Sequence, residues 1–181
     1  MTRVMVAYAT KMGATGEIAQ AIGTELRRAG LDVTVSNASG MTDLSGYDAA
    51  VVGSALYLAR WRPEAGRLLA QQAKQAARIP VWLFQSGPLD GEETARVHTA
   101  VPKNVHRLSV LLDAVPPVTF GGRVEMATAH GFLARRMAHG NTAGDYRDFA
   151  AISRWATEIA GQLAVPPDTW DLAHVPGGLP R

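Results

Sequence analysis

The chain has 181 residues, of which 47% are hydrophobic and 19% are charged, and its formal net charge is +2. This size and composition predict one soluble domain with a full core. The chain has no cysteine, which excludes disulfides, thiolate catalysis and metal clusters held by cysteine. With neither a signal-peptide pattern nor disulfides, we expect it in the cytoplasm. The basic residues are dispersed, so we expect no nucleic-acid partner.

Strands and helices are predicted to alternate along the chain. Apolar or alternating runs predict strands at 3–8, 31–36, 48–53, 79–84 and 115–121, and helical spacing predicts helices at 15–29, 62–77, 103–113 and 145–163. In the first helix Ile18, Ile22 and Leu26 fall on one face, and Gly30 supplies the stop. This alternation predicts a doubly wound α/β fold, a parallel sheet with helices on both faces.

The domain organisation follows from the same pattern. We expect a single domain over 1–163, an insertion at 122–144 after the fifth strand, and a tail rich in proline and glycine at 164–181. Trp82 and Phe84 in the fourth strand are predicted to be core residues. The last helix is expected to present one apolar face, made of Phe149, Ile152, Trp155, Ile159 and Leu163.

Three small or polar clusters follow the first, third and fourth predicted strands, at 10–15, 54–62 and 86–90. In a doubly wound sheet, ligands bind outside the carboxyl ends of the strands. We therefore expect these clusters to form one binding site.

The first cluster, TKMGAT at 10–15, leads directly into the first helix. A helix N-terminus offers unpaired N–H groups and a partial positive charge, which suit an anion. Gly13 permits close approach of the backbone, and the hydroxyls of Thr10 and Thr15 add donors. The spacing matches neither a P-loop nor G-x-G-x-x-G, which favours a lone phosphate. The plain alternative is that Thr15 caps the helix and Gly13 turns the chain.

The three clusters together resemble those of flavodoxin-like proteins: the Thr-x-x-Gly-x-Thr phosphate loop, YDAAVVGSALYLARW at 47–61 and VWLFQSGPLDGEE at 81–93. The resemblance implies a five-stranded parallel sheet of order 2-1-3-4-5 and bound FMN. It implies that the phosphate loop is formed by Thr10, Lys11, Met12, Gly13, Ala14 and Thr15. It implies ring contacts, mainly from the backbone, at Ser54, Ala55, Leu56, Tyr57, Leu58, Ser86, Gly87, Pro88 and Leu89. A deazaflavin remains an open alternative.

Within that superfamily the chain looks most like the menaquinone-dependent protoporphyrinogen oxidases, through GSALY at 53–57, the span after the fifth strand and Trp155. That branch oxidises a porphyrinogen and passes the electrons to a quinone. The chain departs from it at Asp90, Glu92 and Glu93, acids that would repel the propionates of a porphyrin.

Aromatic residues near the predicted ring are few. We expect Tyr57 beside the flavin, and Trp61 either beside it or under the next helix. No aromatic residue occurs between Gln85 and His106, which leaves one ring face open to a reaction partner. Arg60 and Arg62 flank Trp61 and are expected to be a solvated helix start.

Two further kinds of contact are considered. The histidines show no metal-ligand spacing, so no metal site is expected. Arg135 and Arg136 sit in a short basic amphipathic stretch, which offers a peripheral contact with a membrane surface; a solvated helix face is the commoner explanation.

The main functional prediction is an FMN-dependent oxidoreductase that passes electrons from a small reduced substrate to a quinone-type acceptor. The alternative is a flavodoxin-type carrier without its own substrate; carriers of that type usually dock through acidic surfaces, and a net charge of +2 speaks against it. A receiver-like signalling domain would need acids where this chain has Thr10, Lys11 and Ser54.

Overall fold

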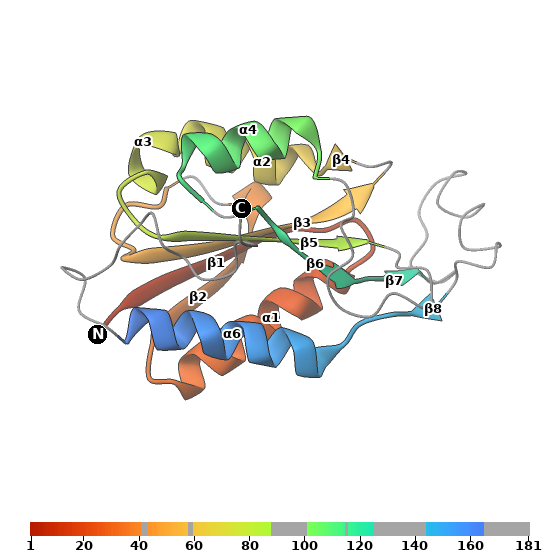
Figure 1. Ribbon diagram of the computed structural model, residues 1–181, viewed down its shortest axis with the longest axis horizontal. Helices are drawn as coiled ribbons and strands as arrows, with labels where there is room; N and C mark the ends of the chain where they lie inside the picture. Colours follow the sequence, from red (N-terminus) through yellow and green to blue (C-terminus); the bar gives the residue numbers. More distant parts are fainter. Residues whose placement is uncertain (41–42, 58–59, 88–100, 115, 125–143, 165–181) are drawn as a thin grey trace, which may run out of the picture.

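A parallel sheet forms the centre of the computed structural model, which describes residues 1–40, 43–57, 60–87, 101–114, 116–124 and 144–164. Its strands are β1 (Arg3–Ala9), β2 (Asp32–Asn37), β3 (Ala49–Tyr57), β5 (Val81–Gly87) and β6 (Val118–Gly121). They lie in the order β2-β1-β3-β5-β6 and pair in parallel (Figure 1). The predicted order 2-1-3-4-5 is thus confirmed.

Helices cover both faces of the sheet (Figure 1). One layer consists of α1 (Ala14–Arg28) and α6 (Phe149–Leu163), and the other of α2 (Pro63–Gln71), α3 (Ala73–Ala76) and α4 (Lys103–Leu111). A short 3₁₀ turn, η1 (Ala38–Gly40), follows β2. The helix α1 ends as predicted, with arginines in its last turn and Gly30 at φ 87°.

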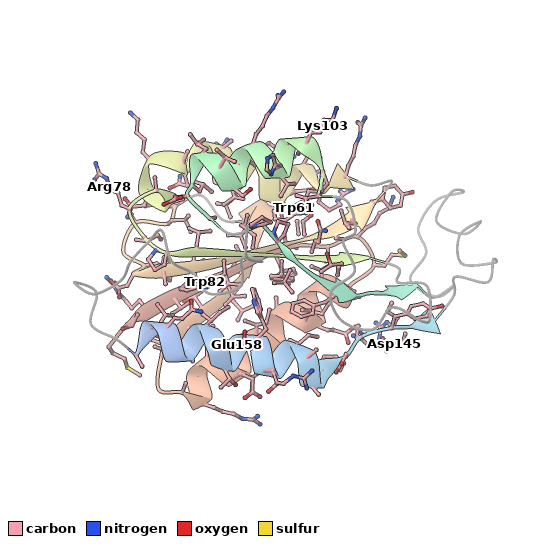
Figure 2. All side chains as sticks on the ribbon, viewed as in Figure 1. Trp61, Arg78, Trp82, Lys103, Asp145 and Glu158 are labelled. Atoms are coloured by element: carbon pink, nitrogen blue, oxygen red, sulfur yellow. The ribbon has the colours of Figure 1, made fainter. Side chains whose placement is uncertain are left out.

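The core is divided by the sheet into two clusters. On the α1 and α6 side, Phe84 packs against Phe120 and Trp155 with ring centroids 6.2 Å away in each case. Trp82 lies on the same side, whereas Trp61 lies between the sheet and the layer of α2 and α4 (Figure 2). Trp82 and Phe84 are core residues, as predicted, with 5% and 0% exposure. Full burial of each such side chain contributes about 1.5–3 kcal/mol.

Gly53 is needed for this packing. A Cβ atom at Gly53 would lie 2.0 Å from the ring of Phe84, on the neighbouring strand β5. Only glycine leaves room for the ring, which explains the glycine in the middle of this buried strand.

The last helix begins later than predicted. Asp148 is its N-cap, and its carboxylate accepts the N–H of Ala151 at 2.9 Å, so the helix starts at Phe149 rather than at Asp145. The prediction that Phe149 belongs to the apolar face is wrong, since this first helical residue is 46% exposed. Ile152, Ile159 and Leu163 are buried, as predicted.

Other elements also differ from the sequence prediction. The strand β5 runs from Val81 to Gly87 rather than over 79–84, so Ser86 and Gly87 belong to the strand instead of following it, and β6 begins at Val118 rather than at 115. The predicted helix at 62–77 is divided into α2 and α3 at Gln72, whose backbone leaves the helical conformation while its side chain accepts the N–H of Leu44. The strand β3 continues to Tyr57, four residues beyond the prediction. Ser54 and Ala55 extend its parallel pairing with neighbouring strands, and Leu56 and Tyr57 pair in antiparallel fashion with the two-residue strand β4 (Arg60–Trp61).

A second small sheet brackets the predicted insertion. The strands β7 (Arg123–Val124) and β8 (Gly144–Asp145) pair in antiparallel fashion. Residues 125–143 between them, and the predicted tail from 165 onward, lie outside the described residues. The domain boundaries therefore stay a prediction.

Candidate functional site

A pocket opens where β1, β3 and β5 end, at the edge of the sheet predicted to carry the site. Its lining comes from four parts of the chain: Thr10, Lys11, Met12, Ala14 and Thr15; Ala55, Leu56 and Tyr57; Ser86 and Gly87; and Gly122 and Arg123. The parallel registers Ala9↔Ser54 and Ala55↔Ser86 bring the three strand ends level with one another. Residues from all three predicted clusters therefore meet in one pocket.

The loop after β1 has the geometry of an anion site. Gly13 is the N-cap of α1 with φ 89°, a conformation that favours glycine. The first backbone bonds of the helix run from the N–H groups of Gly16 and Glu17 to the carbonyl of Gly13. The N–H groups of Ala14 and Thr15 precede these bonds and have no acceptor within the helix. They point out of the N-terminus, where the helix dipole favours a negative charge.

The two threonine hydroxyls have partners within the protein. Thr10 Oγ1 accepts the N–H of Gly13 at 3.0 Å, which fixes the turn. The hydroxyl oxygens of Thr15 and Ser86 lie 2.8 Å apart and are buried. The role observed for both threonines is thus to shape the loop, and their role as phosphate donors stays a prediction. Thr15 is not the helix cap that was the alternative, because Gly13 is.

The residues predicted after the third strand belong to the strand itself. Ser54 is fully buried, and its hydroxyl accepts the N–H of Arg62 at 2.8 Å, so it supports the site from beneath rather than lining it. Ala55, Leu56 and Tyr57 line the pocket, while Leu58 lies outside the described residues.

Tyr57 lines the pocket, and Trp61 does not; the placement of Tyr57 beside the flavin stays a prediction. The ammonium of Lys11 lies 3.5 Å from the centroid of the Tyr57 ring, a cation–π contact that links two of the three loops. Trp61 is 5% exposed, and its indole N–H donates to Gln85 Oε1 at 3.0 Å. Of the two predicted placements for Trp61, the structure supports packing under the next helix.

The third cluster is only partly described. Ser86 and Gly87 line the pocket, whereas Pro88 and Leu89 lie outside the described residues. The carbonyl of Gly87 accepts the N–H of Gly122 at 2.7 Å, which fastens the end of β6 to this side of the pocket.

Four charged residues beside the pocket were not found by the sequence analysis. Arg123 lines the pocket and pairs with Glu17, in the first turn of α1, at 2.7 Å. Arg147, whose side chain is 5% exposed, pairs with the same Glu17 and with Asp145 at 2.6 Å. Glu17 and Arg123 are 106 residues apart in sequence, and no local pattern joins them.

These ion pairs shift the ionisation of their members. The hydrogen bond from Arg147 is the largest cause that lowers the pKa of Asp145 to about 2. The hydrogen bond to Asp145 likewise raises the pKa of Arg147 above its ordinary value. Both groups are charged at neutral pH, so the base of the β7–β8 pair is held to α1 by charge-assisted bonds.

Other expected features can be placed only in part. Among the described residues, no group of three metal-ligating side chains occurs. Within the same residues, no helix combines the length and apolar character needed to cross a bilayer. His106 is exposed on α4. The other histidines, and the basic stretch of Arg135 and Arg136, lie outside the described residues.

Comparison with known proteins agrees with this geometry. A family model described as a flavodoxin domain matches residues 5–138. A comparison with the sequences of curated proteins found no match. Two solved flavodoxins, one from the domain Archaea and flavodoxin 2 from Bacillus cereus, each superpose with a TM-score of 0.60 at 16% and 19% identity. Each alignment covers 91% of this chain and 100% of the flavodoxin.

Larger proteins share the fold as well. The rubredoxin oxygen:oxidoreductase of Desulfovibrio gigas gives a TM-score of 0.62 at 16% identity over 91% of this chain. The chain spans only 36% of the length of that oxidoreductase. At these identities the structural likeness concerns the fold, while the family match covers most of the chain. The chain therefore belongs to the flavodoxin domain family and takes FMN as its cofactor.

Proposed function

We propose that this chain is an FMN-dependent electron-transfer protein of the flavodoxin type. The observation that carries the proposal is the convergence of the α1 N-terminus with the ends of β3 and β5 in one pocket. FMN supplies the electron chemistry when it is bound, and the protein supplies binding, orientation and electrostatics.

The residues of the pocket suit the parts of FMN. The free N–H groups of Ala14 and Thr15 would hold the phosphate, because a helix N-terminus binds an anion without any cationic side chain. Ala55, Leu56 and Gly87 offer small or apolar surface for a flat ring. Tyr57 would flank that ring, and Lys11 fixes the position of Tyr57.

The side chains that line the pocket are consistent with an electron carrier that has no substrate of its own. Among the described lining residues, the ionisable groups are Lys11, Tyr57 and Arg123, and no carboxylate or histidine is present to act as a general acid or base near neutral pH. Positioning the cofactor is therefore the task that these side chains can perform.

A substrate-oxidising enzyme is the second candidate. The resemblance to menaquinone-dependent protoporphyrinogen oxidases supports it, and so does Lys11 in the pocket, whose charge suits an anionic substrate such as a porphyrinogen. Its acceptor would be a quinone, reached through a peripheral contact with a membrane. The acids Asp90, Glu92 and Glu93, which speak against a porphyrin, lie outside the described residues.

One set of measurements tests both candidates. An absorbance titration of the cofactor-free protein with FMN should saturate, and riboflavin should bind more weakly because it lacks the phosphate. The FMN-loaded protein, reduced with dithionite, should then pass electrons to one-electron acceptors. Multiple turnovers of protoporphyrinogen with menadione as acceptor would instead establish the enzyme, and failure to bind FMN would refute both candidates.

A further inference from the structure

A second hollow lies beside the cofactor pocket and shares one residue with it. Tyr57, Arg60, Trp61, Arg62 and Pro63 line this hollow, and Tyr57 also lines the cofactor pocket. Anything bound in the hollow would thus contact a side chain that also faces the predicted flavin. Such closeness to the cofactor suits a docking site for electron exchange.

The hollow rests on a rigid base. The strands β3 and β4 pair in antiparallel fashion, with Tyr57 opposite Arg60 and Leu56 opposite Trp61. The side chains of opposite residues lie on the same face of such a pair, so Tyr57 and Arg60 stand together. The indole of Trp61 is anchored to Gln85, and the backbone N–H of Arg62 is anchored to the buried hydroxyl of Ser54. The shape of the hollow is therefore set by the sheet.

The charge around the hollow is positive. Arg60 is exposed, and Lys11 stands over the ring of Tyr57. Arg62 donates one hydrogen bond to Glu64 at 3.0 Å, which leaves most of the donors of its guanidinium for another acceptor. Glu64 is the acid in this group; its own backbone N–H is the first cause that lowers its pKa, so it stays ionised at neutral pH. Among the described residues around the hollow, Lys11, Arg60 and Arg62 against Glu64 give three positive charges and one negative charge.

The composition of the hollow is that of a protein-binding site. Tyrosine and arginine are among the residue types enriched at the energetic centres of protein interfaces, and this hollow presents both, while the core residue Trp61 supports them from beneath. A single surface cation does not select a partner. Two guanidiniums, those of Arg60 and Arg62, beside the ring of Tyr57 favour the carboxylates of aspartate and glutamate. A partner with an acidic face is the complementary occupant.

We infer that this hollow, defined by Tyr57, Arg60, Trp61, Arg62 and Pro63, is the docking site for an acidic electron-transfer protein. This inference rests on the proposed function and adds the sign of the partner's charge. Acidic flavodoxins dock basic partners, so the partner inferred here carries the opposite charge. The net charge of +2 on this chain speaks against an acidic carrier but agrees with a carrier that docks an acidic partner. Docking here would bring the partner within contact of Tyr57, beside the cofactor.

The test compares one redox protein in two charge states. Native cytochrome c is cationic, and succinylation converts its lysines to carboxylates while the haem is kept. The FMN-loaded chain is reduced with a stoichiometric amount of dithionite and mixed anaerobically with either form, each haem iron taking one electron from Fe(III) to Fe(II). We expect the succinylated form to be reduced about tenfold faster at low salt, with the advantage lost as the salt concentration rises.

Matched variants locate the effect. Arg60→Gln with Arg62→Gln should reduce the preference for the succinylated form at least threefold, and Arg60→Gln alone should reduce it partly without touching the pair between Arg62 and Glu64. Lys74→Gln with Arg78→Gln makes the same change in net charge and should leave the preference unchanged. These two residues are exposed, and Arg78 lies at the end of the sheet opposite β4 (Figures 1 and 2). Glu64→Gln removes the one acid of the group and should raise the preference.

A binding measurement separates docking from electron transfer. Oxidised succinylated cytochrome c should bind the oxidised FMN-loaded chain at low salt in a calorimetric titration, and the double variant at 60 and 62 should bind it more weakly. Faster reduction of native cytochrome c, or equal preference in the two double variants, would overturn the inference while leaving FMN binding and electron transfer intact. Failure to bind FMN at all would instead refute the proposed function.

Discussion

The hydroxyl oxygens of Thr15 and Ser86 lie 2.8 Å apart at the pocket where β1, β3 and β5 end. The two residues are 1% and 4% exposed, and they join the first turn of α1 to the end of β5. The first turn of α1 would hold the phosphate and the end of β5 would contact the ring, so this hydrogen bond sets the distance between the two parts of the proposed site. Three predictions concern this pocket and its surroundings, and a fourth concerns the core beneath it.

The first prediction concerns the buried hydroxyl pair. Thr15→Val keeps the shape of the side chain but leaves the hydroxyl of Ser86 without this partner, and it should lower the free energy of unfolding by about 1–3 kcal/mol. Urea unfolding of the cofactor-free protein measures this. Adding Ser86→Ala should cost less than the sum of the two single changes, since the two residues interact directly.

The control for that prediction is Thr24→Val, at an exposed position of the same helix. The hydroxyl of Thr24 bonds only to a carbonyl one turn earlier in the helix, so the change should stay within about 0.5 kcal/mol. Equal effects at 15 and 24 would show that the buried bond has no special weight.

The second prediction concerns the backbone of Gly13. An added Cβ would meet no atom within 4 Å, so Gly13→Ala tests the positive φ alone. We expect a loss of about 1–2 kcal/mol in unfolding free energy, the usual cost of a left-handed conformation for an L-residue. We also expect weaker FMN binding in a titration, because the strained turn would shift the N–H groups of Ala14 and Thr15.

Gly66→Ala serves as the matched comparison for Gly13→Ala. Gly66 lies within α2 without a positive φ, and an added Cβ there also meets nothing within 4 Å. The change should stabilise the protein by about 0.5–1 kcal/mol, since alanine favours a helix interior. A stabilising effect at position 13 as well would contradict the proposed geometry of the loop.

The third prediction concerns acid stability. The pKa of Asp145 is about 2 in the folded protein against 3.8 ordinarily. Because folding depresses the pKa, the stabilisation is present above pH 4 and is lost as the pH falls toward 2. The side chain of Asp145 is 46% exposed, so solvent screens the pair and the effect should be modest.

The measurement is the free energy of unfolding between pH 2 and pH 6 for the wild-type protein and Asp145→Asn. The two curves should converge near pH 2 and separate up to about pH 4, with the wild type more stable. Curves that stay parallel over that interval would show that the pair with Arg147 does not contribute to stability.

The fourth prediction concerns the contact between Gly53 and Phe84. Gly53→Ala would place a methyl group 2.0 Å from the Phe84 ring, which must then move. Overpacking of this kind costs about 1–3 kcal/mol. Thermal unfolding should show a lower Tm, and Gly161→Ala, where an added Cβ meets nothing within 4 Å in α6, should not lower it. If the two variants melt alike, the close packing of this strand pair is not needed.

Local patterns in the sequence predict the order of the strands and the edge of the sheet at which the pocket opens. Local hydrophobic spacing marks strands and helices, and the alternation of the two predicts a parallel sheet with a ligand edge. The turn at Gly13 could also be predicted from the sequence, because glycine readily adopts the positive φ observed there at the start of α1.

Which polar groups line the pocket and which bond to one another depends on tertiary contacts that the sequence pattern does not show. Thr15 and Ser86 are 71 residues apart, and their mutual bond depends on the register of β3 and β5. The pairing of Glu17 with Arg123 spans 106 residues. The placement of Trp61 in the core, and of Tyr57 between two hollows, depends on the short strand β4. Contacts at such separations arise from strand order and pairing, which no local pattern of residues contains.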